Sequence, residues 1–125
     1  MELNEGLEKL GAKEIVYGSE HAGKVFYGTA IESVRLPSTL KRIETKTFES
    51  CRSLRKVEIP NGGEYIGKDC FMDSGIEEIT LPSTLKELDE KAFSSCSNLK
   101  TIWVEAGCAL DIKQYVKDSV EVRQE

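Results

Sequence analysis

Histidine and cysteine, which often carry out catalysis or bind metals, number one and four in this 125-residue sequence. His21 is the only histidine, and the four cysteines are 19, 26 and 12 positions apart, so neither a Cys/His zinc set nor a CxxC pair occurs. A catalytic triad or Cys–His dyad would have to use His21, which stands in a glycine-containing stretch typical of an exposed loop. We therefore predict no catalytic residues, no metal site and no cofactor.

Three short motifs resemble functional sites, but each lacks a feature that the function requires. Residues 18–24 fit the G-x-x-x-x-G-K pattern of phosphate-binding loops, but the Ser or Thr that should follow to bind Mg²⁺ is Val25. Residues 36–39 (LPST) resemble a sortase sorting signal, lack its glycine and recur in mid-chain. Adjacent carboxylates such as Glu77 and Glu78 would point to opposite faces of a strand and form no catalytic pair. We interpret these as a chance match, repeat structure and solvated positions.

The recurrence is the organising feature of the sequence. Residues 36–40 (LPSTL) return unchanged at 81–85, and prolines and phenylalanines recur every 22 or 23 positions. Alternate coils differ in one spacing, so the full unit is 45 residues, a duplicated pair. The apolar columns are Leu10/Ile43/Ile66/Leu88, Phe26/Phe48/Phe71/Phe93, Ile31/Leu54/Ile76/Leu99, Val34/Val57/Ile79/Ile102, Leu36/Ile59/Leu81/Val104 and Leu7/Leu40/Gly63/Leu85, the last of which lapses at Gly63.

Each coil predicts the same local structures. Apolar residues alternate with charged ones over 54–60, which indicates a short strand with one buried face, ended by proline. Residues 85–89 predict a second short strand, and 90–96 a tight helical or 3₁₀ turn that buries Phe93. Parallel strands from successive coils should stack into a sheet with right-handed crossovers. Cys51 and Cys96 hold the same repeat position, which favours buried free thiols.

The repeating pattern, Ile-Pro-x-x-Leu-x-x-Ile-x-x-x-Ala-Phe-x-x-Cys-x-x-Leu-x-x-Val, resembles the BspA-type (Treponema-type) leucine-rich repeat family. The middle coil departs from it at Gly62, Gly63, Ser74 and Gly75. The resemblance implies an α/β, mostly β, solenoid. It would have a parallel sheet of short strands on the concave face and short strands with 3₁₀ or helical turns behind it. It also implies protein binding, with many members on bacterial or protist surfaces.

We expect one leucine-rich repeat domain over residues 1–125. Residues 1–36 form a degenerate first coil in which a loop, 14–24, is inserted, and residues 37–104 form the regular repeats. Residues 105–125 leave the pattern and are expected to form a C-terminal cap, with a short helix over 111–116 and a strand over 120–122.

The outward strand positions are the candidate binding residues. One column is Ser33/Lys56/Glu78/Thr101 and the other is Arg35/Glu58/Thr80/Trp103, with His21 in the inserted loop added to the set. Strand spacing predicts Lys56 beside Glu78 and Arg35 beside Glu58. These pairs are either ladder ion pairs that maintain solubility or a mixed-charge recognition face. Trp103 is either an exposed binding residue or packs under the cap, against Tyr115.

Charge and composition limit the partners. A net charge of −5 argues against binding to nucleic acid or to anionic membrane, and no apolar run is long enough for membrane insertion. We predict a non-catalytic protein–protein interaction module that binds through the concave strand face. The alternative is a structural spacer in a larger, adhesin-like cell-surface protein, and an enzyme is disfavoured. The partner is left open, as is self-association through the sheet edges.

The compartment is left open as well. The sequence shows no signal peptide, because a basic segment followed by an apolar one is missing from its start. The family resemblance allows a secreted or cell-surface protein, and free cysteines allow a cytoplasmic one.

Overall fold

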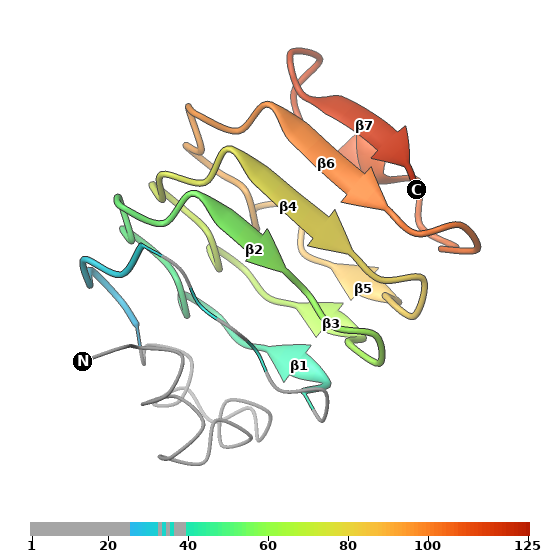
Figure 1. Ribbon diagram of the computed structural model, residues 1–125, viewed down its shortest axis with the longest axis horizontal. Helices are drawn as coiled ribbons and strands as arrows, with labels where there is room; N and C mark the ends of the chain where they lie inside the picture. Colours follow the sequence, from blue (N-terminus) through green and yellow to red (C-terminus); the bar gives the residue numbers. More distant parts are fainter. Residues whose placement is uncertain (1–25, 33, 35, 37–39) are drawn as a thin grey trace.

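Short parallel strands in two sheets form a stepped solenoid in the computed structural model, which describes residues 26–32, 34, 36 and 40–125 (Figure 1). The front sheet has the order β2-β4-β6-β7 and the back sheet the order β1-β3-β5. The predicted fold class, a mostly β parallel leucine-rich-repeat solenoid, is confirmed. The elements are β1 (Arg42–Ile43), β2 (Lys56–Glu58), β3 (Tyr65–Ile66), β4 (Glu78–Leu81), β5 (Glu87–Leu88), β6 (Thr101–Val104), the 3₁₀ helix η3 (Ile112–Tyr115) and β7 (Glu121–Gln124).

The strand register follows the repeat spacing. In the front sheet Lys56 pairs with Glu78, Glu78 with Thr101, and Thr101 with Glu121. In the back sheet Ile66 of β3 pairs with Leu88 of β5. β7 therefore continues the same parallel ladder beyond the regular repeats, with a spacing of 20 residues to β6.

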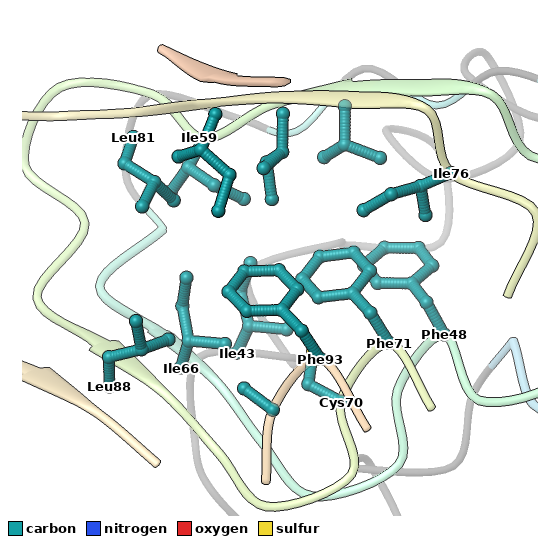
Figure 2. Packing of buried hydrophobic residues seen from close by; sticks show 14 of the residues in the cluster. Ile43, Phe48, Ile59, Ile66, Cys70, Phe71, Ile76, Leu81, Leu88 and Phe93 are labelled. Atoms are coloured by element: carbon teal, nitrogen blue, oxygen red, sulfur yellow. The ribbon is translucent and has the colours of Figure 1, made fainter. Parts of the chain in front are cut away.

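The core lies between the two sheets and is closed on one side by a stack of phenylalanines. Phe26, Phe48, Phe71 and Phe93 stack one ring per coil, with centroids 5.4, 5.4 and 5.6 Å apart. Figure 2 shows three of these rings in a row, with Ile76 beyond them on the front-sheet side. Such offset stacking adds to the burial of the rings.

Turns that carry the phenylalanines differ in detail from the sequence prediction. Residues 90–95 form consecutive hydrogen-bonded turns, such as Ala92 N–H to Asp89 O (3.0 Å) and Ser94 N–H to Lys91 O (3.1 Å), and no helix. The backbone also bonds from coil to coil here, because the Phe71 N–H donates to Ala92 O at 2.9 Å. These bonds between coils satisfy backbone groups that a helix would have used internally.

The buried thiols are confirmed as free. Cys51 Sγ donates to Phe26 O and Cys96 Sγ donates to Phe71 O, each at 2.9 Å, so each thiol links one coil to the preceding one. Burial raises the pKa of Cys96 to about 11 and the pKa of Cys70 well above its ordinary value. Both groups therefore stay protonated and unreactive at neutral pH, whereas Cys108 is free but only half-buried.

Gly63 interrupts an apolar column for a steric reason. It is buried, and a Cβ at this position would lie 2.9 Å from Ile59 Cγ2 and 3.2 Å from Pro60 O. The leucine of the other coils would therefore require Ile59 and Pro60 to shift.

Candidate functional site

The described members of the predicted outward columns lie on the outer face of the front sheet. Lys56, Glu78 and Thr101 form one row across β2, β4 and β6, and Glu58, Thr80 and Trp103 form the other. Between the rows Val57, Ile79 and Ile102 point into the core and are at most 4% exposed. Strand periodicity alone therefore separates this face from the core.

Trp103 lies on this face and is held by the strands on both sides of β6. Its indole Nε1–H donates to Glu78 Oε1 on β4 at 3.1 Å. On the other side Arg123, its register partner on β7, places its guanidinium 5.6 Å from the ring centroid, in cation–π range. The side chain is partly exposed. The sequence left open whether Trp103 packs against Tyr115. The interactions that the structure shows for its side chain are with Glu78 and Arg123 on the sheet, whereas Tyr115 is part of η3.

Charges around Trp103 are paired. The indole hydrogen bond, and next the charge of Lys56, lower the pKa of Glu78 below its ordinary value. Lys56 Nζ lies 3.5 Å from Glu78 Oε2, as the sequence predicts. Glu121 bonds Arg123, which lowers the pKa of the glutamate and raises that of the arginine. These pairs are exposed to solvent and contribute little to stability, so their main effect is to orient side chains.

A shallow depression of about 480 Å³ runs along this face. The lining residues are Lys56, Glu58, Glu78, Thr80 and Trp103, together with Val34, Val57 and Glu125. The depression is open and its lining is mostly polar. It therefore differs from the enclosed, mostly apolar pockets that small molecules generally occupy.

Three predicted binding residues, Ser33, Arg35 and His21, lie outside the described residues, as do the expected Arg35–Glu58 pair and the inserted loop 14–24. The structure places three further residues beside this face, Glu121, Arg123 and Glu125. The sequence prediction missed them because it assigned residues 105–125 to a cap. Val122 pairs with Ile102 and continues an apolar column. The position of Val122 in that column is the feature of the sequence that could have identified β7 as a further strand of the front sheet.

We also searched the described residues for a metal centre and for a membrane-spanning helix. In the described part of the chain, no group of three or more His, Cys, Asp or Glu side chains comes together as a metal site would require. Nor does any helix among these residues have the length and apolar character needed to cross a membrane.

Stacked coils, a two-sheet core and a ladder of phenylalanines define a leucine-rich-repeat solenoid. The family model of the BspA-type leucine-rich repeat region matches residues 21–117 in six copies, and the chain belongs to this family. It is similar to a leucine-rich repeat protein from Bacteroides ovatus whose crystal structure was solved at 1.19 Å. The TM-score is 0.71 and the identity 29%, over 82% of this chain and 27% of that one. A comparison with curated proteins found no match.

Proposed function

We propose that this chain is a non-catalytic protein-interaction module that binds a protein partner through the outer face of the front sheet. The observation that supports this most is the placement of Trp103. A large indole is kept partly exposed and is oriented from both sides by Glu78 and Arg123. Tryptophan and arginine are enriched among the residues that dominate binding energy, and an oriented side chain loses less entropy on binding.

The surroundings of Trp103 fit this role. The indole is surrounded by Thr80, Thr101 and charged side chains of both signs. In a typical protein–protein interface, polar residues likewise surround the central buried residue. The depression beside it gives an approaching segment room to lie along the sheet. Leucine-rich-repeat proteins are typically non-catalytic binding or repeat modules, which agrees with this proposal.

A structural spacer within a larger, adhesin-like surface protein is the second candidate. The chain spans 27% of the length of the Bacteroides ovatus protein it matches, so the fold recurs there as one part of a longer chain. In a spacer the paired charges of the front sheet would serve solubility alone. Trp103 would then contribute to stability and not to binding.

Affinity capture with Trp103→Ala and a matched control separates these functions. Tyr65→Ala is the control, because Tyr65 is also a partly exposed aromatic residue under an arginine, 4.1 Å from Arg42, but on the back sheet. We expect a protein retained by wild type and Tyr65→Ala to bind Trp103→Ala at least about tenfold more weakly. Equal retention by Trp103→Ala would exclude this face, and no specific retention by wild type would support the spacer.

Fluorescence then tests the contact directly with the purified partner. Trp103 is the only tryptophan of the chain, so its emission reports on the proposed face alone. Binding should shift and protect this emission from a soluble quencher. A partner that binds without altering the emission or the quenching would contact another surface.

A further inference from the structure

Within the part of the chain that the structure describes, the C-terminal edge of the front sheet carries strand groups that pair with no other strand. β7 is the end strand of the order β2-β4-β6-β7 (Figure 1). Glu121 and Glu125 donate their N–H groups to β6 and its flank, to Lys100 O at 2.8 Å and Val104 O at 2.9 Å. Since backbone groups alternate sides along a strand, Val122 and Gln124 direct theirs away from β6. An edge of this kind is a template for another strand.

One carbonyl on this edge is occupied by a side chain. In the coils of β2, β4 and β6 the residue before the front strand gives its carbonyl to the next coil. Arg55 O accepts from Glu77 N–H at 2.8 Å, Glu77 O from Lys100 N–H at 2.9 Å, and Lys100 O from Glu121 N–H at 2.8 Å. The equivalent residue before β7 is Val120, and its carbonyl accepts from Lys113 Nζ at 2.8 Å.

The ammonium of Lys113 thus takes the position that a backbone N–H of another strand would occupy. It reaches the edge from η3, and it is near enough to Glu121 to contribute to the lowered pKa of that carboxyl group, after Arg123. A strand that pairs here must break the bond between Lys113 Nζ and Val120 O, and it leaves the ammonium group close to the new interface with less water around it. A lysine on an edge strand opposes pairing for this reason.

We infer that Lys113 closes the C-terminal edge of the front sheet against β7 of a second copy of this chain. An antiparallel, two-fold pairing centred on Val122 would place Glu121 opposite Arg123 of the other copy, so the edge is complementary in charge to itself. The next hydrogen bond in that pairing runs from Gln124 N–H to Val120 O of the other copy. This is the carbonyl that Lys113 covers.

Lys113→Met is the central variant, because it keeps an unbranched apolar stem and removes the ammonium. Lys117→Met is the matched control, since Lys117 is an exposed lysine of the same segment. Light scattering after size-exclusion chromatography should show Lys113→Met associating into dimers at least about tenfold more tightly than wild type and Lys117→Met. Adding Gln124→Pro, which removes the outward N–H, should restore the wild-type mass.

Two results would overturn the inference. One is a Lys113→Met protein that is folded by circular dichroism and has the mass of wild type at every concentration. The other is a dimer that persists with Gln124→Pro, because it would form through a different surface. If Lys113→Met does not fold, Lys113→Ala is measured in the same way and read against the same outcomes.

Discussion

Trp103 depends on three strands at once. Its backbone belongs to β6, its hydrogen bond goes to Glu78 on β4, and its cation–π contact comes from Arg123 on β7. Each coil supplies one part, so the arrangement exists only when the coils are stacked in register. A single repeat could not orient this indole, which ties the candidate binding residue to the integrity of the solenoid.

The bond between Glu78 and the indole predicts a pH response. The pKa of Glu78 is lowered from 4.5, so the carboxylate is ionised at neutral pH and is protonated as the pH falls through the lower, folded-state pKa. Loss of the charged acceptor should weaken the indole bond, and Trp103 emission should change at pH values below about 4.5. A fluorescence titration, with circular dichroism to confirm folding, measures this.

Two controls assign the transition to its carboxylate. Lys56 is the cation that faces the Glu78 carboxylate. Glu121 is the second carboxylate with a lowered pKa, and it is bonded to Arg123. The transition should be absent in Glu78→Ala and remain in Glu121→Ala. Persistence of the same transition in Glu78→Ala would contradict the assignment.

At the scale of the strand and turn, the sequence predicted the features that periodicity controls. The outward columns and the Lys56–Glu78 pair followed from strand alternation and from the regular spacing of 22 or 23 residues between equivalent positions of successive coils. The contact of Arg123 with Trp103 did not follow. It depends on how η3 leads the chain into β7 over a shorter spacing of 20 residues, with few apolar positions to mark the register.

Gly75 explains the other departure of the middle coil. A Cβ there would collide with the carbonyl oxygen of Arg52 and with Nη1 of Arg55. That guanidinium bonds both the Arg52 carbonyl, at 2.6 Å, and the Gly75 carbonyl, at 3.2 Å. The turn after Phe71 has one residue fewer than the turn after Phe48.

Gly75→Ala should therefore destabilise the protein by about 1–3 kcal/mol, the usual cost of forcing extra atoms into a packed site. Urea unfolding followed by circular dichroism gives the change in free energy. Ser97→Ala, at an exposed position of a later turn, is the control and should stay within about 0.5 kcal/mol of wild type. A Gly75→Ala protein as stable as the control would show that the turn opens freely.

At the scale of the whole molecule, the core is continuous but each coil touches only its neighbours. The phenylalanine stack and both sheets run through successive coils, so burial of the last regular coil depends on the segment C-terminal to it. Ile112 and Val120 belong to the core and are 2% and 4% exposed. The segment after residue 105 therefore contributes buried side chains to the core.

Deleting residues 106–125 should expose the end of the core and lower the free energy of unfolding by at least about 3 kcal/mol. Two buried aliphatic side chains, at ~1.5–3 kcal/mol each, account for that minimum. Urea unfolding of the full and shortened chains measures the difference, and Ile112→Ala with Val120→Ala in the full chain should reproduce a large part of it. An unchanged midpoint in the shortened chain would mean that the regular coils are stable alone and that 106–125 closes nothing.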